Sequence, residues 1–126
     1  MELKICHMYP DVLNLYGDRG NVICMRSRLE RRGIDCAVTR LPIGSAASLA
    51  GFDLVFIGGG QDFEQQVLLD DLHRGKAQEI RAAIADGVTF LTICGGYQML
   101  GSYYETYDGQ RCDFIGALDL LSLIHI

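Results

Sequence analysis

The chain has 126 residues, of which 49% are hydrophobic and 21% are charged, and its formal net charge is −5. This length fits one domain or part of one, and the composition supports a buried core, which argues against a wholly disordered chain. The acidic balance argues against a nucleic-acid partner. The one basic cluster, RSRLERR (26–32), has the spacing of a solvated helix face.

The five cysteines are odd in number, and no two of them are spaced as C-x-x-C. This usage is typical of reduced intracellular thiols and argues against a disulfide framework or a zinc site. The N-terminal MELKICHMYPD lacks the long apolar segment of a signal peptide, and no stretch approaches the ~18–20 apolar residues of a membrane helix. We therefore expect a cytoplasmic protein with no membrane insertion and no metal.

The first half of the chain predicts three strands and one helix. Residues 3–8 are apolar and end at a turn, Tyr9-Pro10-Asp11, which predicts the first strand. In 21–33 the apolar residues recur at helical spacing and the pattern stops at a glycine. Residues 35–41 alternate around β-branched residues and predict a second strand. Residues 52–60 form a continuous apolar run that ends in three glycines, which is typical of a buried parallel strand.

The second half continues the alternation. Residues 62–86 predict helical structure interrupted at Gly75, and 88–93 predict another buried strand. A helix is expected to begin after Cys94. The resulting order, β-α-β-β-α-β-α, favours a parallel α/β sheet, in which ligands bind outside the carboxyl ends of the strands. Three segments of interest fall at that edge: residues 9–20, 58–60 and 94–96.

The triplet Gly58-Gly59-Gly60 does not match a common phosphate-binding loop. A dinucleotide fingerprint that started at Gly58 would need a glycine at the sixth position, which is Phe63. A Walker loop would need a lysine followed by serine or threonine, and GGGQDFEQ has neither. Two interpretations remain open: a tight turn, or a backbone that must come close to a ligand with its N–H groups free.

Cys94 lies in TFLTICGGYQML (89–100), between a buried strand and a possible helix. A free cysteine is often a small buried residue, but this strand–turn–helix layout is also that of a nucleophile elbow. An acyl-transfer site needs two backbone donors around one oxyanion. Gly95 is placed to supply one N–H, and Gly59 or Gly60, after the neighbouring strand, the other. This combination predicts hydrolysis of an amide or ester through a thioester.

Three segments together resemble a known family. MYPDVLNLYGDRGN (8–21), GGGQDFEQ (58–65) and ICGGYQMLG (93–101) are similar to class I glutamine amidotransferases of the cobyric-acid-synthase-like branch. The similarity is closest to the GatD subunit of lipid II isoglutaminyl synthase and extends to about Leu118. NLYGDRGN and CGGYQ are its most specific parts. The resemblance implies a flavodoxin-like three-layer sandwich with a mostly parallel sheet, incomplete at the C-terminus.

The resemblance also implies roles for particular residues. Cys94 matches the nucleophile, and Gly59, Gly60 and Gly95 match the oxyanion-hole positions. Gln98 matches the glutamine of the family's C-x-G-x-Q pattern, near the substrate, although a helix-surface position explains it equally well. The residues Asp18, Arg19 and Asn21 match a family signature to which we assign no individual chemistry.

The activity implied is that of a glutaminase subunit that needs no cofactor. In the family, the cysteine hydrolyses glutamine to glutamate and ammonia. A partner ligase of the Mur type, MurT, uses ATP and that ammonia to amidate the D-glutamate of the peptidoglycan precursor lipid II. Two alternatives remain: a glutaminase for corrin-ring amidation in cobalamin synthesis, and a non-catalytic flavodoxin-like module.

The expected site lacks one component, because a thiol nucleophile needs a base that is usually a histidine. His73 is expected on a helix surface, and His7 ends the first strand at the sheet edge where the site is expected. The family's histidine lies well downstream of the cysteine. We expect 1–120 to be the N-terminal part of an amidotransferase domain, and LSLIHI (121–126), which contains His125, to be a non-native tail. A chain without the base is expected to be inactive alone.

Overall fold

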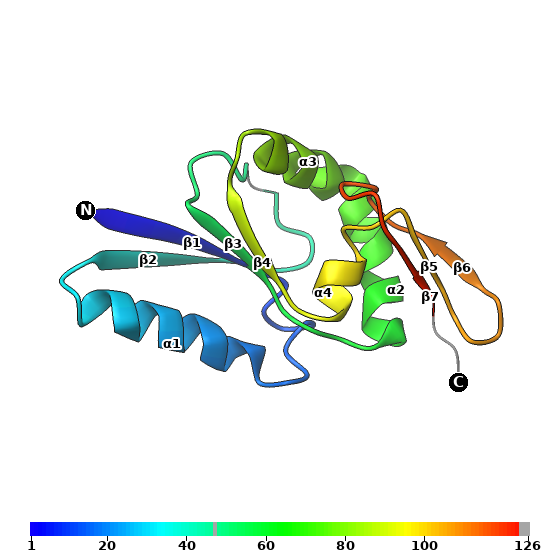
Figure 1. The fold of residues 1–126 in the computed structure, drawn as a ribbon, viewed down its shortest axis with the longest axis horizontal. Helices are drawn as coiled ribbons and strands as arrows, with labels where there is room; N and C mark the ends of the chain where they lie inside the picture. The colour runs from blue at the N-terminus through cyan, green and yellow to red at the C-terminus, as the bar shows by residue number, and fades with distance from the viewer. Residues whose placement is uncertain (47, 124–126) are drawn as a thin grey trace.

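The computed structural model describes residues 1–46 and 48–123. Figure 1 shows a parallel sheet with helices on both faces and a small second sheet at the end of the molecule opposite the N-terminus. The elements in chain order are β1 (Glu2–Met8), α1 (Asp18–Glu30), β2 (Asp35–Leu41), β3 (Leu54–Ile57), α2 (Asp62–Asp71), the π-helix η1 (Leu72–Lys76), α3 (Ala77–Ala85), β4 (Thr89–Thr92), α4 (Gly95–Gln98), β5 (Tyr103–Glu105), β6 (Arg111–Asp113) and β7 (Leu121–Leu123).

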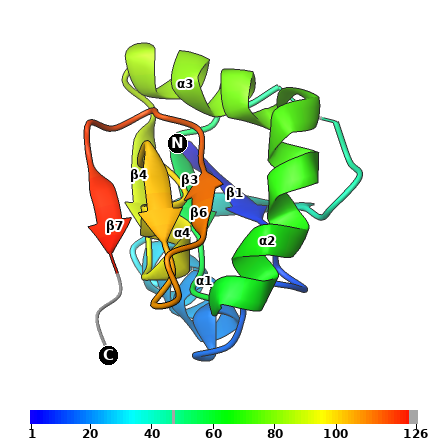
Figure 2. The same ribbon diagram turned by 90° about the vertical axis from the view of Figure 1, so that its right-hand side faces the viewer.

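The main sheet has the order β2-β1-β3-β4, and all of its strand pairs are parallel. Helix α1 lies on one face of this sheet, whereas α2 and α3 lie on the other (Figures 1 and 2). The predicted flavodoxin-like α/β fold is therefore confirmed. Because the strands are parallel, their carboxyl ends share one edge of the sheet.

The core lies between the sheet and helices α2 and α3. Successive strand residues point to opposite faces, and Met8 and Ile57, which are paired in register, belong to the same buried cluster as Leu68 and Ile80 of the helices. The opposite face of the sheet carries His7 and Phe56, which are paired in register on β1 and β3.

Two helix boundaries show how local geometry decides where a helix begins or bends. Helix α1 begins at Asp18, three residues before the predicted start. Gly17 precedes it with φ 71°, and the side-chain oxygen of Asn14 accepts a hydrogen bond from the Arg19 N–H at 2.8 Å. The predicted interruption at Gly75 is confirmed, since this residue has φ 133° and ψ −27° inside η1.

The region after Cys94 differs from the prediction. The expected helix spans only four residues, and the chain enters the small sheet at Tyr103. Gly101 marks the change, because a β-carbon there would lie 2.5 Å from Leu120 Cδ1. β5 pairs antiparallel with β6 and parallel with β7. The hypothesis that 121–126 is non-native stays a prediction. Residues 124–126, which include His125, lie outside the described residues.

None of the helices in the described ranges combines the length and the apolar character needed to span a membrane.

Candidate active site

Cys94 follows β4 and occupies a backbone conformation that non-glycine residues rarely adopt. Its φ is 48° and its ψ is −112°, and within the described ranges Tyr9 is the only other non-glycine residue with a positive φ. The chain reverses here, because Gly96 N–H donates to Ile93 O at 2.8 Å and Gln98 N–H donates to Cys94 O at 3.0 Å. The Cys94 side chain is exposed. Strain of this kind is typical of a nucleophile elbow.

The turn that carries Cys94 packs directly on the glycine turn 58–60. Ile93 N–H donates to Ile57 O at 3.0 Å, so the strand pairing continues past the end of β4. A β-carbon on Gly95 would lie 2.7 Å from Gly60 O, a distance that real β-carbons essentially never show. A β-carbon on Gly96 would likewise lie 2.5 Å from Gly58 O. The two turns therefore touch backbone to backbone, which explains why glycines occupy both.

Gly59 lies between Cys94 and an aromatic ring. A β-carbon on Gly59 would lie 3.5 Å from the Cys94 β-carbon and 2.7 Å from Cδ2 of Tyr16. Tyr16 is 61% exposed, so its ring borders the approach to the cysteine. Sequence reasoning did not single out Tyr16, although the residue lies within the NLYGDRGN segment.

Asp18 holds the segment 9–20 against the same glycine turn. Its side chain is buried, and its Oδ2 accepts a hydrogen bond from the Tyr16 N–H at 3.3 Å. A β-carbon on Gly58 would lie 2.8 Å from the β-carbon of Asp18. Arg19 and Asn21 are exposed, and Arg19 lies 3.8 Å from the carboxylate of Asp11. Of the three signature residues, Asp18 is therefore the one that positions the loop beside the glycine turn.

Gln98 is held by protein groups at both ends of its amide. Its Oε1 accepts a hydrogen bond from Gln65 Nε2 at 3.0 Å, and its Nε2 donates to Ser122 Oγ at 2.8 Å. Gln65 is 3% exposed and its Nε2 lies 2.8 Å from the β-carbon position of Gly95. Sequence reasoning missed Gln65, and the only available signal was its place in the GGGQDFEQ segment.

The two histidines in the described residues lie in different environments. His7 is 2% exposed and packs edge-on against Phe56, with ring centroids 5.3 Å apart. Burial lowers the pKa of His7, and Arg40 and Arg19 lower it further. His73 is exposed on η1.

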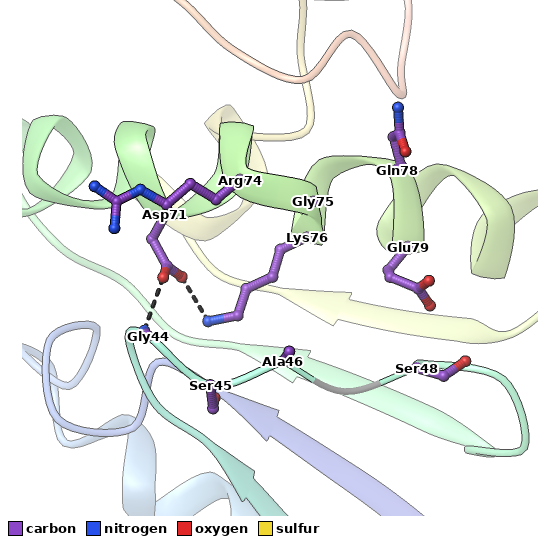
Figure 3. A pocket seen from close by; sticks show the side chains of 10 residues that line it. All are labelled: Gly44, Ser45, Ala46, Ser48, Asp71, Arg74, Gly75, Lys76, Gln78 and Glu79. Atoms are coloured by element: carbon purple, nitrogen blue, oxygen red, sulfur yellow. Dashed lines mark hydrogen bonds and ion pairs between the residues drawn. The ribbon is translucent and has the colours of Figure 1, made fainter.

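A cavity of about 590 Å³ lies away from the cysteine, beside the kink between α2 and α3 (Figure 3). Asp71 accepts hydrogen bonds there from Gly44 N–H and Tyr9 Oη, each at 2.8 Å, and it pairs with Lys76. Burial disfavours the Asp71 carboxylate, but these hydrogen bonds outweigh burial and lower its pKa. Lys76 also donates to Pro42 O, so this buried pair is satisfied and acts as a structural tie.

Metal ligands are not gathered anywhere in the described ranges, where no group of three or more histidine, cysteine, aspartate or glutamate side chains is suitably placed. The reactive group that the Cys94 turn presents is an exposed thiol at a strained backbone position.

Comparison with known protein families matches residues 4–125 to the CobB/CobQ-like glutamine amidotransferase domain. The chain belongs to this family. Two curated relatives of the chain are GatD subunits of lipid II isoglutaminyl synthase (glutamine-hydrolyzing). The subunit from Staphylococcus aureus is 42% identical over 118 residues, which cover 94% of this chain and 48% of the relative. The subunit from Streptococcus pneumoniae is 37% identical over 93% of this chain and 45% of the relative.

A more distant relative of the chain is a probable cobyric acid synthase from Methanoculleus marisnigri. It is 37% identical over 65 residues, which cover 52% of this chain and 13% of the relative. The chain thus spans about half the length of the GatD relatives, and a much smaller share of the cobyric acid synthase.

Proposed function

We propose that the chain provides the nucleophile and the oxyanion donors of a glutaminase, with Cys94 as the catalytic residue. The observation that carries this proposal is the Cys94 turn: a family member has an exposed thiol at φ 48° directly on the 58–60 glycine turn. The thiolate attacks the carboxamide carbon of glutamine, and the Gly95 N–H and an N–H of Gly59 or Gly60 stabilise the oxyanion. Ammonia leaves as the thioester forms, and water then cleaves the thioester to give glutamate.

The acceptor of the ammonia is inferred from the relatives. Two of them are subunits of lipid II isoglutaminyl synthase, and they match 93–94% of this chain. We therefore infer that the ammonia passes to a MurT-like Mur ligase that amidates the D-glutamate of lipid II in the cytoplasm during cell-wall synthesis. Corrin amidation is the second candidate, but the cobyric acid synthase match covers only 52% of the chain.

The described residues alone are expected to turn over glutamine slowly. His7 is buried against Phe56 and His73 is exposed on η1, and we expect the base that assists Cys94 to be a different histidine. General-base assistance typically contributes ~10²–10⁴-fold. A glutamate-release rate close to that of a complete glutaminase, abolished by Cys94→Ala, would contradict this expectation.

The test is labelling with a glutamine analogue that carries a chloroketone in place of the carboxamide. Such a reagent needs a reactive thiol and a glutamine-shaped site, but not a complete turnover. Peptide mapping is expected to find the label on Cys94, and excess L-glutamine is expected to slow the reaction. Cys24→Ala is the matched control, because Cys24 is also an exposed thiol. Labelling that survives Cys94→Ala, or that glutamine does not slow, would favour the non-catalytic module.

The partner is tested separately. The gene next to the one encoding this chain should encode a Mur-ligase-like protein, and the two proteins should co-purify after co-expression. A neighbouring gene for corrin synthesis instead would favour the alternative acceptor.

A further inference from the structure

Gln65 is a buried amide that the proposed reaction does not use. It lies one turn inside α2, and its side chain is 3% exposed. The start of α2 is fixed by a capping box, in which Gln61 N–H donates to Glu64 Oε2 at 2.9 Å. Gln65 therefore projects from a fixed helical turn.

The Gln65 side chain contacts the turn of Cys94 at two points. Its Nε2 lies 2.8 Å from the β-carbon position of Gly95, so the amide packs on the backbone of the residue next to the cysteine. The same Nε2 donates to Gln98 Oε1 at 3.0 Å, and Gln98 N–H in turn donates to Cys94 O at 3.0 Å. Two hydrogen bonds therefore connect Gln65 on α2, through Gln98, to the backbone carbonyl of Cys94.

The side-chain amide oxygen of Gln65 is unusual. Within the described ranges, Gln65 Oε1 is buried and has no hydrogen-bond partner. A buried amide oxygen left without a partner destabilises the folded state. A methionine at this position would fill similar space without that cost. Glutamine is therefore explained better by its amide contact with Gln98 than by packing alone.

We propose that Gln65 is a positioning residue that, through Gln98, holds Cys94 and Gly95 in the geometry needed for reaction. The inference rests on the proposed function for its catalytic meaning. It depends on the Gln65–Gln98 pair and not on Ser122, which belongs to the segment expected to be non-native. The strained φ of Cys94 requires such support, because the surrounding structure must hold a residue in that region.

The experiment compares Gln65→Met, Gln98→Met and the double variant in the whole chain. The matched control is Gln66→Met, because Gln66 is the exposed neighbour on the same helix. Hydrogen exchange of the peptide covering 93–101 is expected to be about tenfold faster in each single variant, as loss of one hydrogen bond implies. The double variant should be no faster than either single variant, because the two residues act as a pair. Gln66→Met should exchange like the wild type.

A second measurement separates positioning from mere loss of structure. The rate of Cys94 labelling by the glutamine chloroketone is divided by its rate with iodoacetamide, and this ratio should fall about tenfold in the Gln65 and Gln98 variants. Cys6 reports global unfolding, since it is 1% exposed and burial raises its pKa to about 12. If Gln65→Met lets Cys6 react, the half-buried Gln98→Met decides the outcome.

Unchanged exchange at 93–101, an equal effect of Gln66→Met, or multiplying effects in the double variant would overturn the proposal. A labelling ratio that stays at the wild-type value while exchange rises would reduce Gln65 to a structural role and would also overturn it. If glutamine fails to protect wild-type Cys94, the proposed function fails instead, and the exchange measurement still decides whether the Gln65–Gln98 pair holds the turn.

Discussion

Gly96 faces the carbonyl oxygen of Gly58 so closely that a β-carbon at position 96 would lie only 2.5 Å from that oxygen. The other two nearest atoms belong to Ile57, at 2.8 Å, so the strand end and the glycine turn leave no room on this side. The Cys94 turn therefore keeps its position only while residue 96 has no side chain.

Gly96→Ala is therefore expected to lower the free energy of unfolding by about 1–3 kcal/mol, the usual effect of overpacking. Urea denaturation measures the change. Gly20→Ala is the matched control, because Gly20 lies in α1 with nothing within 4 Å of its β-carbon position. That substitution should stabilise the chain by up to about 1 kcal/mol through helix propensity. Equal stability of the two variants would show that the turns do not pack as described.

Local patterns predicted the parts of the site that depend on neighbouring residues. The strand before Cys94, the glycines after it and the interruption at Gly75 are each visible within a few residues. The structure has the elbow at Cys94 and the kink at Gly75. The parallel sheet also followed from the order of its elements.

Contacts between residues far apart in the sequence could not be predicted from local patterns. Gln65 meets Gly95, and Tyr16 meets Gly59, only because two strand ends and a loop gather at one sheet edge. No periodicity marks a side chain that leans over a turn thirty or more residues away. The small sheet was missed for another reason: strands of three residues, such as β5, are too short to show alternation.

His7 should make stability depend on pH below neutrality. Its pKa is lowered from the ordinary value of 6.5, first by burial and then by Arg40 and Arg19. Above pH 6.5 both the folded and the unfolded chain carry neutral His7, and its contribution is fully present. As the pH falls below 6.5, the unfolded chain binds the proton first. Stability is therefore lost until the pH reaches the lower folded pKa.

His7→Leu is expected to remove this part of the pH dependence. At pH 7 the variant should remain within about 1 kcal/mol of the wild type, because the lost ring contact with Phe56 is offset by removal of an unpartnered nitrogen. Urea unfolding at pH 7.5, 6.5 and 5.5 compares the two chains. If both lose the same free energy between pH 6.5 and 5.5, the dependence comes from other groups.

Removing one partner of the buried pair Asp71–Lys76 should strongly destabilise the chain. Asp71→Asn leaves Lys76 charged at 6% exposure without its carboxylate, and breaking a buried pair in this way typically costs about 3–5 kcal/mol. Thermal and urea unfolding measure the loss. Asp70→Asn makes the same substitution at the exposed neighbouring position and should change stability by less than about 0.5 kcal/mol. Comparable effects of the two would mean that the pair is solvated.

Leu91 is expected to drive self-association of this chain. It lies on β4, the outermost strand of the four-stranded sheet, and is 39% exposed on the α1 face. On the same face a groove of about 400 Å³ lies between α1 and the sheet, and its lining combines apolar residues such as Ile5, Met25 and Leu54 with charged residues such as Arg28. Exposed apolar strands at a sheet edge promote association.

Leu91→Lys should therefore reduce the concentration-dependent increase in sedimentation coefficient. Ile23→Lys adds the same charge at an exposed site on α1 outside the groove, and it should sediment like the wild type. Equal relief from both substitutions would indicate a general effect of charge, with no role for this edge of the sheet.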